Sequence, residues 1–133
     1  MKILGIDYGE KRVGLAISDE SRTLARELEV VSPKEFFRKI KGLVREHGIG
    51  RMVLGWPLNM KGEETKKTQE VREFREKLSK TVDVPVDIAD ERLSSLMALH
   101  LPGGDKNTDS LAAQIILQNY LDKKKVTDNA GRL

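Results

Sequence analysis

The first part of the chain contains two short apolar segments separated by a polar turn, and this arrangement constrains the fold more than any other feature. Residues 3–18 read ILGIDYGEKRVGLAIS. Short apolar runs of this kind are typical of strands, and the turn from Gly9 to Lys11 is brief enough to require antiparallel pairing. The first strand ends on a carboxylate, Asp7. A carboxylate beside packed apolar side chains is unfavourable without a partner, so Asp7 indicates either a turn or a ligand site.

The rest of the chain alternates between helical and strand patterns. Ser32, Pro33 and Glu35 form an N-terminal capping pattern, and Gly48 marks the end of the same helix. We predict an α/β fold with a five-stranded mixed sheet, in the order β-β-β-α-β-α-β-α, and with helices on both faces. The predicted strands are 2–8, 12–18, 24–31, 51–57 and 84–90, and the predicted helices are 32–48, 63–80, 93–101 and 108–124, with a flexible tail at about 124–133.

The composition narrows the kinds of site that the chain can hold. Its 133 residues suit a single domain, 1–133. The chain has no cysteine and two distant histidines, His47 and His100, which excludes a disulfide framework and a zinc cluster, so any metal must be bound by oxygen. No apolar stretch approaches the length of a membrane span, and we expect a cytoplasmic protein without a membrane partner. The net charge of +3 favours an anionic partner only modestly.

Three acidic residues that are far apart in the sequence are expected to meet at one edge of the sheet. Asp7 ends the first strand, Glu91 follows the last strand, and Asp109 lies in the first turn of the last helix. Ligands of open α/β sheets bind at the carboxyl ends of the strands, near the point where strand order reverses. Clustered carboxylates repel one another unless cations are present, and Mg²⁺ prefers oxygen ligands. Two such ions can activate water and stabilise the leaving oxygen of a phosphodiester.

Each acid also has a purely structural interpretation. Asp7 can form an Asx turn, Glu91 can pair with Arg92 at the surface, and Asp109 can interact with the positive end of a helix dipole. The hypothesis of a metal site therefore depends on the three acids converging. The short segment DYGEKRVG also suggests the phosphate-binding turn of actin-like ATPases, but we find neither a second copy of it nor enough residues for the second half of such a protein.

Basic residues accompany two of the acids. Lys11 and Arg12 follow the first strand, and Arg92 follows the last, so all three are candidates for phosphate contacts, which position a nucleic acid without reading its sequence. The lysines at 123–125 are typical of solvated surface charge. Trp56 is able to stack on a base, but the proline that follows it at a strand end favours a packing role.

Four segments, in order, resemble one protein family. They are GIDYGEKRVGLAISD, GWPLNMKGEE, DERLSS and DSLAAQIILQNYLD, and they cover most of the chain. They resemble the YqgF family, also called RuvX, whose members have an RNase H-like fold. The resemblance implies that Asp7, Glu91 and Asp109 are the catalytic, metal-binding acids, with Mg²⁺ or Mn²⁺ as cofactor. One segment departs from the family pattern, because only LMALHLPGGDKNT separates DERLSS from Asp109, where the family has a longer helix and a loop rich in lysine and arginine.

The resemblance further implies a metal-dependent nuclease that hydrolyses phosphodiester bonds and leaves a 5′ phosphate. Members of the family are described as Holliday-junction resolvases and as nucleases that mature the 5′ end of small-subunit ribosomal RNA. The expected partners are therefore precursor ribosomal RNA or branched DNA, together with the ribosomal small subunit, for a monomer or a homodimer. The alternative is a nucleic-acid or ribosome-binding module that keeps the fold without the chemistry, which the short segment before Asp109 favours.

Overall fold

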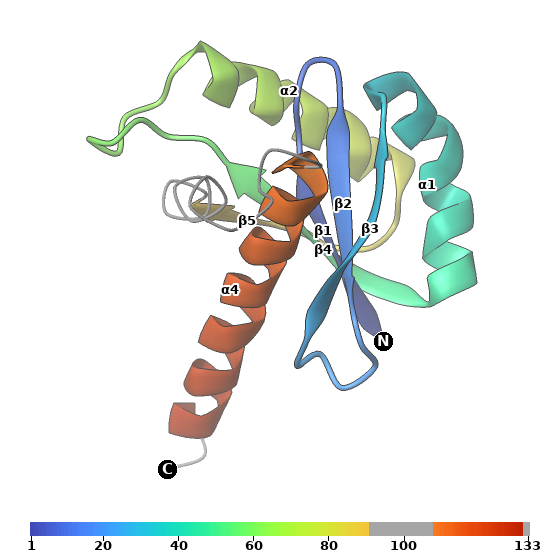
Figure 1. Ribbon diagram of the computed structural model, residues 1–133, viewed down its shortest axis with the longest axis vertical. Helices are drawn as coiled ribbons and strands as arrows, with labels where there is room; N and C mark the ends of the chain where they lie inside the picture. Colours follow the sequence, from blue (N-terminus) through green and yellow to red (C-terminus); the bar gives the residue numbers. More distant parts are fainter. Residues whose placement is uncertain (91–107, 132–133) are drawn as a thin grey trace.

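The structure, a computed structural model, describes residues 1–90 and 108–131, with side chains at 1–90 and 110–123. It contains a five-stranded sheet in the order β3-β2-β1-β4-β5 (Figure 1). β1 to β3 form an antiparallel meander, whereas β1, β4 and β5 are parallel. The elements are β1 (Lys2–Asp7), β2 (Val13–Ser18), β3 (Ala25–Val31), α1 (Pro33–His47), β4 (Ile49–Trp56), α2 (Lys66–Thr81), β5 (Val86–Asp90) and α4 (Thr108–Gly131). The predicted fold class is confirmed, and the predicted helix at 93–101 lies outside the described residues.

The sequence signals at the ends of α1 act as expected. The backbone N–H of Glu35 donates a hydrogen bond to Ser32 Oγ at 3.1 Å, and Pro33 is the first residue of the helix. Gly48 ends the helix with φ at 65°, a left-handed conformation that favours glycine because a side chain would be strained there.

Two helix boundaries differ from the prediction. α2 begins at Lys66 rather than at 63, because Leu58 and Glu64 form a bridge across the preceding loop and hold that stretch extended. α4 continues to Gly131, so the segment predicted as a flexible tail from about 124 is helical up to that residue. No glycine or proline interrupts the helix before Gly131, which explains why it does not end earlier. Within the described residues, no helix is long and apolar enough to cross a membrane.

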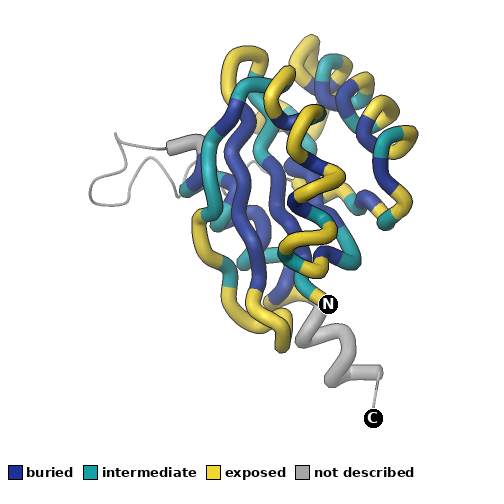
Figure 2. Tube along the Cα trace, turned by 90° about the vertical axis from the view of Figure 1, so that its right-hand side faces the viewer, coloured by how far each residue is buried: buried dark blue, intermediate teal, exposed yellow. Residues whose placement is uncertain are grey.

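Helices cover both faces of the sheet. α1 and α2 pack on one face and α4 packs on the other (Figures 1 and 2). Because side chains alternate along a strand, Leu4 and Ile6 of β1 enter the core under α1 and α2, whereas Ile3 enters the core under α4. The prediction of helices on both faces is therefore confirmed, and each face has its own apolar core.

The contact between α4 and β1 is very close. A Cβ atom built on Gly5 would lie 2.7 Å from Leu117 Cβ and 3.1 Å from the carbonyl oxygen of Ala113. Leu117 and Ala113 are both fully buried. At this point α4 therefore packs directly on the backbone of β1. The absence of a side chain at Gly5 determines how closely the helix approaches the sheet.

A polar contact ties the second half of α4 to the sheet. The Tyr120 hydroxyl donates a hydrogen bond to Asp87 Oδ2 at 2.5 Å, and Arg51 Nη1 donates to the same oxygen at 2.8 Å. Burial, followed by the hydrogen bond from Tyr120 to Asp87 and the negative charge of Asp87, raises the pKa of Tyr120 to about 12. The neutral hydroxyl is thus the form that the folded state stabilises.

We expect Gly5→Ala to destabilise the protein by about 1 to 3 kcal/mol, because the new methyl group overlaps Leu117 and forces α4 away from β1. Gly42→Ala on α1 is the matched control, since a Cβ there meets nothing within 4 Å. The control is expected to gain about 0.5 to 1 kcal/mol from the better helix propensity of alanine. Denaturant unfolding measures the free energy of unfolding of both variants. If the two substitutions changed it equally, α4 would not pack closely on β1 at Gly5.

Tyr120→Phe is expected to destabilise the protein by about 1 kcal/mol near neutral pH, because it removes the hydrogen bond to Asp87. The folded-state pKa of Tyr120 is raised from 10.0 to about 12, so the stabilisation is complete below pH 10 and is lost as the pH rises toward 12. The stability difference between wild type and Tyr120→Phe should therefore shrink across this interval. Denaturant unfolding at several pH values tests this, and a constant difference would show that Tyr120 titrates alike in both states.

Candidate functional site

Asp7 lies at the carboxyl end of β1, the central strand of the sheet. It is paired with Gly14 of β2 and is half-buried. Its position in the strand alternation places it with Ile3 and Gly5 on the face that α4 covers. Neighbouring β4 and β5 end at Trp56 and Asp90, which are paired with each other. We call this side of the sheet, where β1, β4 and β5 end, the carboxyl edge.

The first turn of α4 begins at the same edge. Ala113 lies over Gly5, whereas Tyr120, farther along the helix, contacts Asp87 near the start of β5, so α4 runs antiparallel to β1. The rise of a helix places the backbone of Asp109 about 6 Å before Ala113, and the rise of a strand places Asp7 about 7 Å beyond Gly5. Both displacements point toward the carboxyl edge. From this geometry, we expect the backbones of two predicted site residues, Asp7 and Asp109, to lie at the same edge of the sheet.

The alternation of side chains along β5 shows which of its residues face α4. Asp87 contacts Tyr120 of α4, and Ala89 packs against the α4 core, so the odd-numbered residues of β5 face α4. Asp90 has the opposite parity and is exposed. The predicted residues Glu91 and Arg92 lie outside the described residues.

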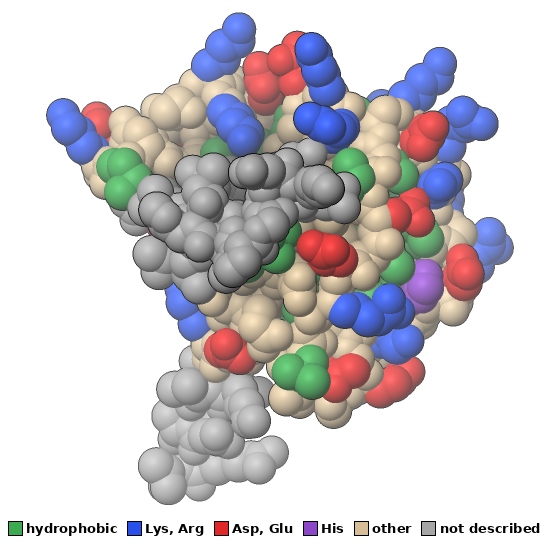
Figure 3. All heavy atoms as spheres, viewed as in Figure 1, with side chains coloured by type: hydrophobic (Ala, Val, Ile, Leu, Met, Phe, Trp, Pro, Cys, Tyr) green, Lys and Arg blue, Asp and Glu red, His purple; other side chains and the backbone are tan. Residues whose placement is uncertain are grey.

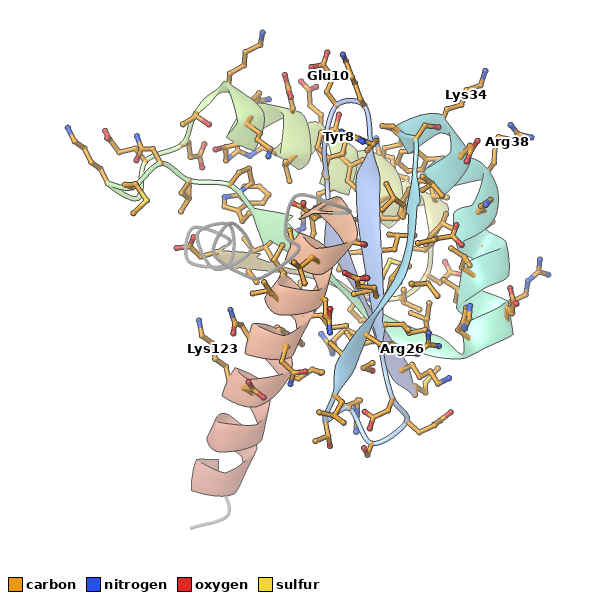
Figure 4. All side chains as sticks on the ribbon, viewed as in Figure 1. Tyr8, Glu10, Arg26, Lys34, Arg38 and Lys123 are labelled. Carbon is orange, nitrogen blue, oxygen red and sulfur yellow. The ribbon has the colours of Figure 1, made fainter. Side chains whose placement is uncertain are left out.

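The turn between β1 and β2 is tightly built and borders the carboxyl edge. A Cβ on Gly9 would lie 2.5 Å from the carbonyl oxygen of Arg12, so the turn has room only for glycine at that position. Tyr8 leaves the turn toward α2, where its ring centroid is 4.7 Å from that of Phe74 (Figure 4). The predicted phosphate-contacting residues Lys11 and Arg12 are both exposed on this turn.

Acidic residues surround Tyr8. Burial raises the pKa of the Tyr8 hydroxyl, and the negative charges of Glu70, Glu10 and Glu73 raise the same pKa further, in that order. Tyr8 therefore stays a neutral donor and acceptor beside the turn. The sequence did not indicate that Tyr8 lies near Glu70 and Glu73. These acids belong to α2, and α2 meets the β1–β2 turn through the packing of Tyr8 on Phe74.

Trp56 has a packing role in this structure. Its ring packs against the core under α1 and α2, and the Arg72 guanidinium carbon lies 5.4 Å from the ring centroid. Arg72 also forms an ion pair with Glu64 at 2.5 Å, and Thr68 donates a hydrogen bond to the Pro57 carbonyl. These contacts fix the loop after β4, and the favoured packing interpretation of Trp56 is consistent with them.

Of the three predicted metal-binding acids, the structure describes the side chain of Asp7. Among the side chains of 1–90 and 110–123, no three His, Cys, Asp or Glu residues gather as a metal-binding group. The side chain of Asp109 and the whole of Glu91 lie outside the described residues. The convergence of the three carboxylates therefore stays a prediction, which the contact of α4 with β1 at Gly5 supports.

Comparisons with known proteins identify the family of this chain. The family profile of RuvX, described as Holliday junction resolvase, matches residues 1–123. A protein from Dictyoglomus thermophilum named "Putative pre-16S rRNA nuclease" is 38% identical, over 95% of this chain and 99% of its own length. A protein of the same name from Maridesulfovibrio salexigens is 40% identical, over 91% of this chain and 98% of its own length.

Solved structures agree on the fold. Thermus thermophilus RuvC, solved in complex with a Holliday junction substrate, has a TM-score of 0.63 at 14% identity, covering 94% of this chain and 96% of RuvC. A second structure of the same RuvC has a TM-score of 0.61 at 15% identity. These likenesses show an RNase H-like fold. From the profile match and the relatives together, the chain belongs to the RuvX family.

Proposed function

We propose that this protein is a metal-dependent nuclease that hydrolyses phosphodiester bonds at the carboxyl edge of its sheet, with Asp7, Glu91 and Asp109 as the metal-binding acids. The observation that carries the proposal is the close contact of α4 with β1 at Gly5, because it directs the first turn of α4, which contains Asp109, toward the end of β1, which contains Asp7. Membership of the RuvX family supports the same chemistry. The proposed localisation is cytoplasmic.

The three proposed acids offer carboxylate oxygens, which suit Mg²⁺ or Mn²⁺. All three candidates are carboxylates, which are the ligands that hard divalent cations prefer. Asp7 is half-buried at the end of a central strand, which holds its backbone rigidly. When bound, two such ions would activate the attacking water and stabilise the leaving oxygen of the phosphodiester.

The acid proposed from this part of the chain is Glu91, which follows the last residue of β5, Asp90. Asp90 itself is exposed and does not belong to the alternate residues of β5, Asp87 and Ala89, that face α4.

The remaining residues of the site position the substrate. Lys11 and Arg12 on the β1–β2 turn, with Arg92 after β5, would hold the phosphates that flank the cleaved bond. The rigid turn at Gly9 fixes where Lys11 and Arg12 leave the sheet. The neutral Tyr8 beside them adds no further negative charge at this end of the protein.

We propose precursor 16S rRNA as the substrate, cut at or near its 5′ end, with the ribosomal small subunit as the partner. This follows from relatives of near-equal length and 38–40% identity that carry the name of a pre-16S rRNA nuclease. The second candidate activity is resolution of Holliday junctions, which the description of the family favours. A resolvase that cuts two strands symmetrically would act as a homodimer, whereas the rRNA nuclease can act as a monomer.

Asp7→Asn is expected to lower Mg²⁺- or Mn²⁺-dependent cleavage by at least about 100-fold, the size of effect that loss of one electrostatic group at a reacting centre produces. The fold should be unchanged, because the amide has nearly the same shape. Cleavage of a precursor rRNA fragment and of a four-way DNA junction by one preparation, with Mg²⁺ or with EDTA, measures the activity and the substrate preference. Titration calorimetry with Mn²⁺ alone measures the metal site separately.

The matched control is Asp122→Asn, which lies on the exposed side of α4 far from its first turn. Asp122 accepts a hydrogen bond from Gln118 Nε2 at 3.1 Å, and the asparagine oxygen can accept the same bond. This variant should cleave and bind Mn²⁺ as wild type does. Normal cleavage by Asp7→Asn would contradict the proposed site, and RNA binding without cleavage or metal binding in wild type would favour the non-catalytic module.

A further inference from the structure

The positive charge of the protein is concentrated on α1. This helix carries Lys34, Arg38, Lys39, Lys41 and Arg45 against Glu35 and Glu46, which gives it a net charge of +3. The whole chain also has a net charge of +3, so the rest of the protein is neutral in sum. A net charge that looks modest for the chain is therefore strong for one helix.

Four of these cations form one row along the exposed side of α1. Lys34, Arg38, Lys41 and Arg45 follow a spacing of four, three and four residues, which places them within about 60° of one another around the helix. We call these four residues the basic stripe. It is about 16 Å long, from the rise of the helix. All four are exposed, and Lys34 and Arg38 point away from the protein (Figure 4).

The basic stripe is not neutralised by the residues around it. Among the described side chains, no carboxylate forms an ion pair with any of the four. Lys39, on another side of α1, shows the contrast, since it pairs with Glu29 at 3.3 Å. By the helical period, Glu46 lies on the side of Lys39, and Glu35 lies between the two sides, where it lines a surface pocket with Arg38 and Lys39. The stripe therefore presents four positive charges to solvent, with one carboxylate beside them.

α2 extends the positive surface beside the stripe. A surface pocket of about 510 Å³ is lined by Lys41 and Arg45 of the stripe and by Lys80 of α2, with Asp83 as its one acidic lining residue. Lys77 of α2 lies close by, with its Nζ 4.3 Å from the ring centroid of Phe37. Lysine and arginine side chains are visible along the margin of the protein over α1 (Figure 3).

The stripe starts at the carboxyl edge and leads away from it. β3 ends at Val31, which pairs with Val13 at the start of β2, and the next residue of β2, Gly14, pairs with Asp7. α1 follows directly, so Lys34 is near the carboxyl edge and Arg45 is far from it. The stripe lies on the face of the sheet opposite to α4.

We propose that the basic stripe binds the phosphate backbone of the nucleic acid where it extends beyond the carboxyl edge. A regular row of cations suits a polymer of regularly spaced phosphates. An acidic protein suits it less well, because protein interfaces depend on apolar or aromatic anchors. Among the described residues, the large exposed apolar side chains are Met1, Leu24, Met60 and Ile88, and none is on α1. The proposal rests on the proposed function, since it assumes a nucleic-acid substrate.

The test compares two double variants with the same change in charge. K41E/R45E removes half of the stripe, and R26E/K123E removes two exposed cations that lie outside the stripe, on β3 and α4 (Figure 4). Binding is measured in EDTA, at several salt concentrations, with a labelled single-stranded RNA of about 30 nucleotides. Polyglutamate serves as the acidic-polypeptide probe.

We expect K41E/R45E to bind the RNA about 25-fold more weakly at 0.1 M salt, with a log–log salt dependence shallower by about 1.4. Its cleavage rate at saturating substrate should equal that of wild type. R26E/K123E should match wild type in every measurement. Because binding is measured without metal, this result stands or falls independently of cleavage by wild type, which tests the proposed function.

Two outcomes would overturn the inference. Equal loss of affinity in both double variants would mean that net charge alone attracts the RNA. Unchanged affinity of K41E/R45E for the RNA would mean that the stripe does not contact the RNA. If this variant lost only its binding of polyglutamate, the stripe would be a binding surface for an acidic protein. Circular dichroism and thermal unfolding confirm that each variant is folded, and K41Q/R45Q repeats the comparison without introducing new acids.

Discussion

The direct contact of α4 with the backbone of β1 at Gly5 determines how the rest of the structure is arranged. Because the helix rests on the strand with no side chain between them, its height and direction over the sheet are fixed at that point. The hydrogen bond from Tyr120 to Asp87 then fixes the far half of the same helix. Together these two contacts direct the first turn of α4 to the end of β1. The position of Asp109 relative to Asp7 follows from them, and with it the site at which nuclease chemistry is proposed.

The sequence predicted the fold well because its signals are local. The hairpin follows from two apolar runs around Gly9, and α1 follows from Ser32 and Gly48 at its ends. The α/β order, the mixed sheet and the helices on both faces are confirmed. Two helix boundaries were wrong. The start of α2 depends on a bridge in the preceding loop, and the end of α4 depends on the absence of a stop signal, and a periodic pattern reports neither. For the site, the sequence indicated Asp7, Glu91 and Asp109, and their convergence stays a prediction that the direction of α4 over β1 supports.

What the sequence did not show was the role of residues that act through tertiary contacts. Gly5 reads as an ordinary strand glycine until α4 is placed on it. Likewise, the charge of +3 appeared weak because it was counted over the whole chain rather than over α1. The fold converts an unremarkable composition into two distinct surfaces, an acidic position at the carboxyl edge and a basic row beginning beside it. In the proposed function, a nucleic acid bound along the second surface would be guided to the first, and this would compensate for the short segment before Asp109.

The central claim is that divalent ions bind at the carboxyl edge between β1 and the start of α4. A crystal structure of wild type grown with Mn²⁺, with anomalous diffraction recorded to locate the metal, tests it most directly. The account predicts an anomalous peak at about 2.0 to 2.2 Å from a carboxylate oxygen of Asp7, with Asp109 and Glu91 oxygens completing the protein ligands. Mn²⁺ bound only elsewhere, or the Asp109 carboxylate turned away from a metal held by Asp7, would contradict it.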